Sequence, residues 1–558
     1  MKLIPMPKNL IVEKGYLATK KINLKTVPIS KNLLKALEDF EMCNEGIPLE
    51  LSYGLEGEGY TLEINEKISI KGDSEKGAFY AIQTLKQLFE MEKVPYVFIK
   101  DAPDFPHRGF YHDVTRGKVP TVESIKKLID KLAYFKINSL QLYVEHTFEF
   151  EEYKGVIEKT GYLTAEEMKE IDLYCKERYI DFIPSLSTFG HLYELLEKEE
   201  YKHLQVLDDY KKENIRWPER QHHHTIDPQK EESFELIKSL ISQFEPNFTS
   251  EYFNICCDET FDLKEKDPTG ELYVSFLKKL ISDVTSKGKK VMMWADIILK
   301  YPERIKELPK DIIFLNWNYY GVNEEAFEKL SEAGVTQISC PGTSTWNNFC
   351  EGISIEEDNI LKMADAAYRH KALGILNTNW GDWGNVCTVE LATYGLALGA
   401  GVSWNIETKA DDHFKDCANA LIYKNEKAYD YLCEVSRYQH RLWMNFGTLY
   451  SNLKYEKQME YKDFPEKENC FKIQEHYLSL SKELENYNDE YTKEMYIASL
   501  AYLNIIEIMM KYHKLDFERK GNLKKFIKLY SESWLEKNKE SELSRIINVF
   551  EVLNDKLF

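Results

Sequence analysis

Between Arg108 and Asn405 one pattern recurs along the chain: a short apolar stretch, a polar loop, and then a helical segment with one apolar face. Eight stretches are predicted to be strands, at residues 109–115, 139–144, 180–186, 252–257, 290–295, 312–317, 336–340 and 373–378. Eight strand-helix units over about 300 residues favour a closed (β/α)8 barrel of the TIM type over an open doubly wound sheet. No glycine-rich phosphate-binding fingerprint follows any of these stretches, so a nucleotide-binding fold is not predicted.

Two further domains are predicted to flank the barrel. Residues 1–100 contain a stretch of alternating apolar and polar residues followed by a helical stretch, which is typical of a small α+β domain. The barrel domain is predicted to span residues 101–405. Residues 406–558 are charged and periodic at helical spacing, and they predict a C-terminal helical domain. The predicted fold class is therefore α/β, with a barrel between a small N-terminal domain and a helical C-terminal domain.

The amino-acid composition limits the classes of binding partner and the cellular compartment that we expect. The formal net charge of −20 disfavours nucleic acid and anionic membrane surfaces, because both would repel the average surface of the protein. The ten cysteines include no CxxC pair, and several lie inside apolar stretches, which indicates reduced thiols. Prolines and charged residues interrupt the N-terminal stretch where a signal peptide needs an apolar segment. We expect a cytoplasmic protein with a small-molecule or oligosaccharide substrate, and a homo-oligomer is left open.

The candidate catalytic residues are two adjacent acids at the end of the fourth predicted strand. The apolar run from Tyr252 to Cys257 ends in Asp258 and Glu259. Carboxylates at the carboxyl end of a barrel strand lie where barrel enzymes keep their active sites. The alternative is structural: Asp258 would cap the next helix, and Glu259 would be a solvated surface residue. The residues at the other strand ends help to choose between the catalytic and the structural interpretation.

Those strand ends carry the side chains of a sugar-binding site. They comprise acids, histidines, an arginine and five of the nine tryptophans: Asp113, Arg116, Glu145, His146, His191, Trp294, Asp296, Trp317, Asn318, Tyr319, Tyr320, Trp346, Trp380, Asp382 and Trp383. Indole rings stack on the apolar faces of pyranoses, while arginine and carboxylates bind the hydroxyl groups. A single tryptophan would more often belong to the core, but five at strand ends together favour a sugar site.

Three segments carry a resemblance to a known family. Residues 105–146, FPHRGFYHDVTRGKVPTVESIKKLIDKLAYFKINSLQLYVEH, resemble the opening of the catalytic barrel in family 20 glycoside hydrolases, the β-N-acetylhexosaminidases. Residues 256–260, CCDET, resemble the paired Asp-Glu motif of that family, and residues 76–88, KGAFYAIQTLKQL, resemble the end of its small N-terminal domain. The resemblance covers roughly residues 60–405 and implies a sugar-cleaving barrel that needs no cofactor.

The resemblance also implies roles for individual residues. Arg108 would bind the 3- and 4-hydroxyls of the sugar, and His191 would support the acid. Glu259 would be the general acid/base, and Asp258 would orient the 2-acetamido group. The remaining residues implied to line the pocket are Trp294, Trp317, Trp380 and Asp382, the last of them at the 4- or 6-hydroxyl.

Some positions depart from the family pattern. Cys256 and Cys257 stand where family members usually have two glycines, and Glu145 stands where many have an aspartate. The tyrosine that binds the acetamido group is not evident after the seventh strand, where Trp346 lies. Tyr319 or Tyr320 could take its place. These departures predict a divergent branch of the family.

The adjacency of the acids predicts a mechanism. An acid and a protein nucleophile must stand about 5–5.5 Å apart on opposite sides of the bond, which neighbouring residues do poorly. Adjacent acids suit a substrate whose own acetamide attacks the anomeric carbon to form an oxazolinium ion. The predicted function is a retaining exo-β-N-acetylhexosaminidase acting on terminal β-linked GlcNAc or GalNAc. The alternative is a sugar-binding barrel without catalysis. Burial and the charge of Asp258 are expected to raise the pKa of Glu259.

A metal site is not predicted. The segment HHHTID, residues 222–227, contains three consecutive histidines, but these cannot all face one ion in regular structure. We expect this segment to line the rim of the cleft.

Overall fold

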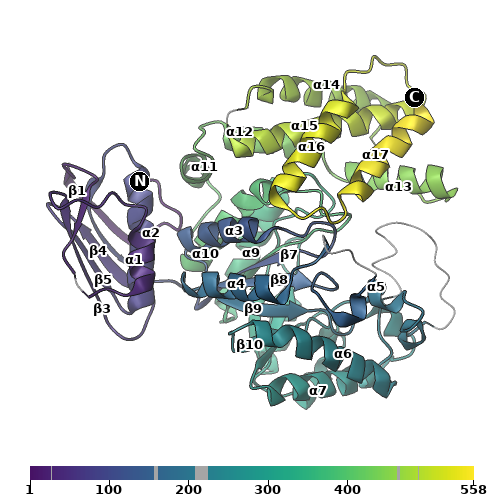
Figure 1. The fold of residues 1–558 in the computed structure, drawn as a ribbon, viewed down its shortest axis with the longest axis horizontal. Helices are drawn as coiled ribbons and strands as arrows, with labels where there is room; N and C mark the ends of the chain where they lie inside the picture. The colour runs from purple at the N-terminus through teal and green to yellow at the C-terminus, as the bar shows by residue number, and fades with distance from the viewer. Residues whose placement is uncertain (27, 156–160, 208–223, 462–464, 488) are drawn as a thin grey trace.

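The computed structural model describes residues 1–26, 28–155, 161–207, 224–461, 465–487 and 489–558. It has three parts, which Figure 1 shows as a sheet with two helices, a barrel, and a group of long helices packed against the barrel. Within the described ranges, no helix combines the length and the apolar character that crossing a bilayer requires.

The N-terminal part is a six-stranded sheet covered by helices α1 and α2. The strands are β1 (Asn9–Tyr16), β2 (Ile22–Leu24), β3 (Ile47–Tyr53), β4 (Tyr60–Ile64), β5 (Ile68–Gly72) and β6 (Pro95–Asp101), in the order β1-β6-β4-β5-β3-β2. Strands β4 and β5 alternate buried and partly exposed residues, as the sequence pattern predicts. Helices α1 (Lys31–Leu37) and α2 (Glu75–Glu90) lie between this sheet and the barrel.

The central part is a closed barrel of eight parallel strands, which confirms the predicted fold class. The strands are β7 (His107–Asp113), β8 (Ser139–Val144), β9 (Asp181–Leu186), β10 (Tyr252–Asn254), β11 (Lys290–Trp294), β12 (Ile313–Trp317), β13 (Thr336–Cys340) and β14 (Gly374–Asn379). Closure comes from parallel pairing of β14 with β7, which runs from Gly374 opposite His107 to Asn379 opposite His112. The carboxyl ends of all eight strands therefore meet on one face.

Helices follow most of the strands, and local signals fix where several begin. They are α3 (Val122–Tyr134), α4 (Ala165–Lys176), α5 (Tyr193–Leu196), α6 (Glu231–Phe244), α7 (Glu271–Ser286), α8 (Glu324–Glu332), α9 (Ile353–Arg369) and α10 (Thr393–Trp404). The side chain of Thr121 caps α3, and the predicted capping box of Thr164 and Glu167 opens α4. Short 3-10 turns at Ile298–Lys300 and Pro302–Glu307 follow β11 in place of a helix.

The C-terminal part is helical, as predicted. Its helices are α11 (Asp412–Ala418), α12 (Ala428–Ser436), α13 (Leu442–Tyr455), α14 (Lys467–Leu484), α15 (Glu490–Tyr512), α16 (Leu523–Lys537) and α17 (Leu543–Leu557), with a π-helical turn at Asn419–Tyr423. Helix α15 lies at the centre and is buried along most of its length. This domain holds the barrel loops near the strand ends, because the indole N–H of Trp443 donates to the carbonyl of Trp383 at 2.8 Å.

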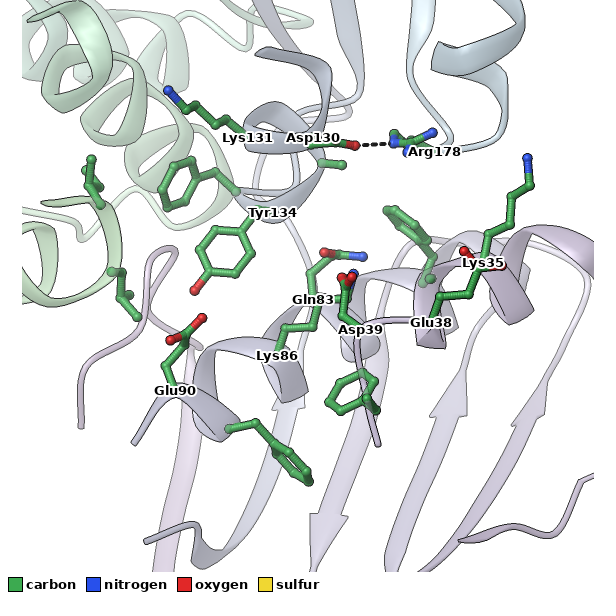
Figure 2. A pocket seen from close by; sticks show the side chains of 18 of the residues that line it. Lys35, Glu38, Asp39, Gln83, Lys86, Glu90, Asp130, Lys131, Tyr134 and Arg178 are labelled. Atoms are coloured by element: carbon green, nitrogen blue, oxygen red, sulfur yellow. Dashed lines mark hydrogen bonds and ion pairs between the residues drawn. The ribbon is translucent and has the colours of Figure 1, made fainter. Parts of the chain in front are cut away.

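A cavity of about 980 Å³ lies where the three parts meet. Figure 2 shows Tyr134 of α3 pointing across this cavity toward Glu90 of α2. Charges on its wall are paired, as in Lys86 with Asp39 and Arg178 with Asp130, both at 2.6 Å. None of the strand-end residues predicted to bind sugar lines this cavity. It is a joint between domains and lies apart from the candidate active site.

Candidate active site

Arg116 is the charged centre of the site. It follows β7, and its guanidinium lies 3.1 Å from Asp113, 3.3 Å from Asp382 and 3.8 Å from Glu145. The same guanidinium lies over the ring of Trp380, 5.0 Å from its centroid. Burial opposes the charge of Arg116, but the surrounding carboxylates outweigh it and hold the pKa of the guanidinium well above its usual range. Three strand ends are thereby joined through one side chain.

The prediction that Arg108 binds the sugar is wrong. Arg108 lies near the amino end of β7, is fully buried, and donates to the carbonyls of Phe105 and Lys136. It also forms an ion pair with Glu58 of the N-terminal domain at 2.6 Å. A strand of this length spans roughly 20 Å, so Arg108 and Arg116 stand at opposite ends of the barrel. Arg116, and not Arg108, is the arginine that lies at the carboxyl ends of the strands among the predicted site residues.

His191 bridges the two predicted catalytic acids. Its Nε2 atom lies 3.3 Å from Oδ2 of Asp258 and 3.4 Å from Oε2 of Glu259. Burial lowers the pKa of His191, but the charge of Asp258 and the close contacts with both acids raise it well above its usual range. The surroundings of His191 therefore favour the protonated imidazolium next to both carboxylates. The predicted supporting position of His191 agrees with this geometry.

His224 is a site residue whose role the sequence did not reveal. Its ring stacks on that of His191, with centroids 4.7 Å apart and planes at 10°. Its Nδ1 atom accepts the backbone N–H of His191 at 2.8 Å. Burial and the charge of His191 lower the pKa of His224 to about 4, so this imidazole is neutral. The preceding residues of the HHHTID segment, 222 and 223, lie outside the described residues.

Glu259 reverses one expectation. Its side chain is 31% exposed, whereas Asp258 is buried. Burial raises the pKa of Glu259, but the close contact with His191 and its charge, followed by the charge of Arg116, lower it below its usual value. The expected rise in the pKa of Glu259 is therefore wrong for this structure, because the sequence could not place the imidazolium beside it.

The turn after β10 positions Asp258 and Glu259. The fourth strand ends at Asn254, three residues earlier than predicted, because Cys256 and Cys257 adopt left-handed backbone angles, with φ of 56° and 66°. Glycine is the residue that takes this conformation without strain. The Asn254 side chain accepts the N–H of Cys256 at 2.9 Å, and the Tyr273 hydroxyl donates to the carbonyl of Cys257 at 2.8 Å. Cys256 and Cys257 thus adopt the left-handed backbone conformation that glycine takes easily, although they replace the glycines of the family pattern.

Two neighbouring residues also support the acid pair. Asp296, after β11, accepts the backbone N–H of Glu259 at 3.0 Å. Burial and the charge of Asp258 raise the pKa of Asp296 to about 7. A β-carbon at Gly190 would lie 2.6 Å from the carbonyl oxygen of Asp258, so only glycine fits there. The sequence noted Asp296 at a strand end but gave it no role.

An aromatic wall completes the site. Trp294 and Trp380 pack together with centroids 5.8 Å apart, and the Trp380 indole N–H donates to the Tyr319 hydroxyl at 2.6 Å. Tyr319 stacks on Trp317 at 5.1 Å and contacts Trp346 at 5.0 Å. Tyr320 is 69% exposed and stands edge-on to Trp346, with centroids 6.5 Å apart. Of the two tyrosines left open by the sequence, Tyr319 is the one that contacts Trp317 and Trp380.

Glu145 lies beside Arg116 and accepts the Tyr143 hydroxyl at 2.8 Å. Burial raises the pKa of Glu145, but the neighbouring His146 and the charge of Arg116 lower it to about 2.

Three residues of the site have a spacing that suits a metal ion. Within the described part of the chain, one group has suitable spacing: ligand atoms of His191, Asp258 and Glu259 lie within 4.8 Å of one another. They are the same residues that share the imidazolium proton, which a metal ion would have to displace.

Comparison with known proteins gives matches over most of the chain. The family model described as "Glycosyl hydrolase family 20, catalytic domain" matches residues 105–373. The model described as "Glycosyl hydrolase family 20, domain 2" matches residues 1–102. A beta-hexosaminidase of Porphyromonas gingivalis is 30% identical over 45% of this chain and 37% of its own length. A beta-hexosaminidase of Vibrio furnissii is 23% identical over 59% of each chain. The chain thus spans about a third to three-fifths of the length of such curated relatives.

Solved structures show the same fold. The chitobiase of Flavobacterium johnsoniae has a TM-score of 0.63 and 19% identity, covering 100% of this chain and 99% of that one. An exo beta-N-acetylglucosaminidase of Vibrio harveyi, in complex with N-acetylglucosamine, has a TM-score of 0.59 and 19% identity over 75% and 76% of the two chains. At 19% identity, these similarities show that the fold is shared.

Proposed function

The chain belongs to glycosyl hydrolase family 20, and from this premise we propose that it is a retaining exo-β-N-acetylhexosaminidase acting on terminal β-linked GlcNAc or GalNAc. One observation carries the proposal. The adjacent carboxylates of Asp258 and Glu259 both reach one imidazolium, yet they differ in setting: Asp258 is buried and Glu259 opens toward solvent.

Asp258 has the features of a group that holds an acetamide. Its Oδ1 atom is buried and has no hydrogen-bond partner among the residues that the structure describes. A buried acceptor without a partner costs roughly 1–3 kcal/mol, so the site favours a ligand that brings a donor. The N–H of a 2-acetamido group is such a donor. With its N–H held there, the acetamide oxygen would attack the anomeric carbon and form the oxazolinium ion, whose positive charge the carboxylate balances.

Glu259 has the features of the acid. The departing oxygen needs one proton, and His191 holds a proton 3.4 Å from Oε2 of Glu259. We infer that the His191–Glu259 pair stores this proton and that Glu259 delivers it to the leaving oxygen. In the second step, Glu259 would take a proton from the water that opens the oxazolinium ring. A water attack on the face that the leaving group vacated retains the β configuration.

Arg116 and the aromatic wall would hold the sugar. The guanidinium is fixed between Asp113 and Asp382, and Asp382 lies beside it to bind the same hydroxyl groups. A planar fork suits two adjacent hydroxyls. Trp294 and Trp380 would provide apolar surface for the acetamido methyl group and the sugar ring.

Hydrolysis of p-nitrophenyl β-N-acetylglucosaminide and β-N-acetylgalactosaminide tests the proposal, with p-nitrophenyl β-glucoside and β-galactoside as controls without the acetamide. We expect release from the first pair and essentially none from the second. Proton NMR of the first product should detect the β-anomer, and an α-anomer would exclude the mechanism. Binding of N-acetylglucosamine without any hydrolysis would favour the sugar-binding barrel instead.

A further inference from the structure

A second cavity lies outside the barrel, where the helical domain meets it. Its volume is about 280 Å³, close to the lower end of the range for small-molecule sites. Its walls come from α3, from the loop between β14 and α10, and from the end of α16. The apolar side chains in these walls include Ile125, Leu128, Cys387 and Val389. The cavity therefore offers apolar surface to a ligand of modest size.

Strand β7 separates this cavity from the candidate active site. His112 and Asp113 are neighbours on that strand, so their side chains point to opposite sides of it. Asp113 pairs with Arg116 in the candidate active site, and His112 lines the cavity. Asn385 also lines the cavity, and its Nδ2 atom donates to the backbone carbonyl of Asp113 at 3.1 Å. The cavity is thus a separate site that shares one supporting strand with the acids.

Two polar atoms of the cavity wall are buried without a partner. The Nδ1 atom of His112, a residue only 9% exposed, has no hydrogen-bond partner in the part of the chain that the structure describes. The same is true of the Oγ1 atom of Thr388. Burial lowers the pKa of His112 to about 4, which favours the neutral imidazole with one N–H. Unpaired buried polar groups are costly, and both of these can donate, so the wall favours a ligand with an acceptor.

Lys118 brings a buried positive charge to the same wall. It is 6% exposed, and its Nζ atom donates to the carbonyls of Val386 and Cys387 at 3.2 and 2.6 Å. The rings of Tyr530 and Trp534 lie near this ammonium, with centroids at 5.9 and 5.0 Å. None of these four partners carries a negative charge. Burial outweighs the neighbouring charges and lowers the pKa of Lys118 to about 8. A buried ammonium of this kind is stabilised by an anion.

The charges around the cavity leave room for one anion. The wall carries four lysines and two glutamates, namely Lys118, Lys127, Lys131, Lys537, Glu390 and Glu490. Lys537 contacts both glutamates, at 3.0 and 3.3 Å, and also Glu494 at 2.8 Å. Asp130, the remaining acid of the wall, pairs with Arg178 at 2.6 Å. Four lysines therefore stand against three glutamates, an excess of one positive charge.

We propose that this cavity binds a small organic anion, with one carboxylate on an apolar body. The carboxylate accepts hydrogen bonds from Lys118, His112 and Thr388, which compensates the excess charge and satisfies both unpaired atoms. The apolar body packs against Ile125 and Leu128 of α3. The site is distinct from the one that holds Asp258 and Glu259, and it gives the junction of barrel and helical domain a role in ligand binding.

Isothermal titration calorimetry of the full-length protein with benzoate is the first test. Benzoate carries one carboxylate on an apolar ring, benzamide has nearly the same shape without the charge, and benzylamine carries the opposite charge. We expect binding of benzoate, roughly tenfold weaker binding of benzamide, and no binding of benzylamine, because the wall supplies donors and an ammonium.

Variants locate the site. Thr388→Val removes one hydroxyl and keeps the shape of the side chain, so the affinity for benzoate should fall roughly fivefold to tenfold. Lys118→Met removes the buried charge, so it should cost tenfold or more, roughly, and make benzoate and benzamide bind alike.

The matched control for Lys118→Met is Lys136→Met. Lys136, just before β8, is also buried, and burial lowers its pKa to about 8 as well. It differs in having an acid partner, Asp101 at 3.8 Å, and it does not line the cavity. Lys136→Met should therefore leave the affinity for benzoate unchanged, whatever it costs in stability.

Several results would overturn the inference. They are the absence of benzoate binding, equal affinities for benzoate and benzamide in the wild type, a preference for benzylamine, and an unchanged affinity in Thr388→Val. If Lys118→Met does not fold, Thr388→Val decides alone, because loss of one hydroxyl leaves the packing in place. None of these measurements requires hydrolysis of an N-acetylhexosaminide, so this inference and the proposed function can fail separately.

Discussion

At the scale of single residues, the proton between His191 and Glu259 controls the chemistry that we propose. In this proposal, a protonated His191 lowers the pKa of Glu259 and also holds the proton that Glu259 would deliver. Asp258 contributes to the same balance, because its charge is what raises the pKa of His191. The three side chains therefore act as one unit, and their substitutions should not be additive.

Glu259→Gln should remove the acid without removing the fold. General acid catalysis contributes roughly 10²–10⁴-fold, so kcat/KM for a disaccharide should fall by that factor. An aryl substrate with a good leaving group needs less protonation and should lose less. Steady-state kinetics on both substrates check this, with the exposed Glu307→Gln as control. Equal, small losses on both substrates would reject Glu259 as the acid.

Arg116→Lys should impair substrate binding, whereas Arg108→Lys should lower the stability of the protein. Lysine cannot reproduce the paired geometry of the guanidinium, so Arg116→Lys should raise KM and lower kcat/KM roughly 10- to 100-fold. Arg108→Lys leaves buried acceptors unpaired and should cost about 2 kcal/mol of stability or more, with KM unchanged. Kinetics and urea unfolding of both variants separate the two roles. A normal KM in Arg116→Lys would move the hydroxyl-binding site elsewhere.

These two arginines also mark the limit of prediction from sequence at this scale. The strand-end acids, His191 and the tryptophans could be predicted, because position after an apolar strand is a local signal. The motif around Arg108 does not reveal that this residue lies near the amino end of β7, away from the acids. His224 belongs to the segment that was expected at the rim of the cleft, but it is fully buried. Its stacking on His191 could not be predicted, because no local pattern encodes a contact between residues 33 positions apart.

At the scale of elements, helix starts and strand ends differ in how much the sequence reveals. The helix starts at Thr121 and Thr164 depend on hydrogen bonds within four residues, so the sequence is sufficient. The end of β10 depends on backbone angles at Cys256 and Cys257 that apolar residues rarely adopt. An apolar run predicts a longer strand there. The turn is instead fixed by partners from elsewhere in the chain, including Tyr273.

Substitutions of Cys257 should report the strain of this turn. Cys257→Gly relieves a left-handed conformation that costs roughly 1–2 kcal/mol but adds flexibility to the unfolded chain, so stability should change by less than about 1 kcal/mol. Cys257→Val keeps the left-handed angle with a branched side chain and should cost about 2 kcal/mol or more. Urea unfolding measures both. Cys175→Val, in the regular helix α4, is the matched control and should cost less.

At the scale of the whole molecule, the helical domain is a support for the barrel face. Trp443 donates to the carbonyl of Trp383, next to Asp382, and the Tyr502 hydroxyl accepts the N–H of Phe349 in the loop after β13. The sequence predicted the domain from its helical periodicity. It could not predict where the domain docks, because docking depends on contacts between residues 60 and 153 positions apart.

A buried pair of acids at this docking surface should make stability depend on pH. Glu351 and Glu356 are fully buried beside α10, and the backbone of Glu351 accepts the side-chain N–H of Gln439 from the helical domain at 3.0 Å. Burial raises the pKa of Glu351 to about 8, and burial with the charge of Glu351 raises that of Glu356 well above its usual value. Both shifts favour the protonated carboxyls in the folded protein at neutral pH.

The sign of the effect follows from linkage. Below pH 4.5 both carboxyls are protonated in the folded and unfolded states, so they contribute no pH dependence. Between pH 4.5 and about 8 the unfolded chain releases these protons while the folded chain keeps them, so the free energy of unfolding should fall as pH rises. Glu351→Gln keeps a neutral side chain of the same size and should flatten this slope, making the variant more stable than wild type near pH 8. Glu332→Gln, on the surface helix α8, should leave the slope unchanged. Urea unfolding between pH 5 and 8 measures the slopes; an identical slope in Glu351→Gln and wild type would mean that the pair ionises in the folded protein at no cost.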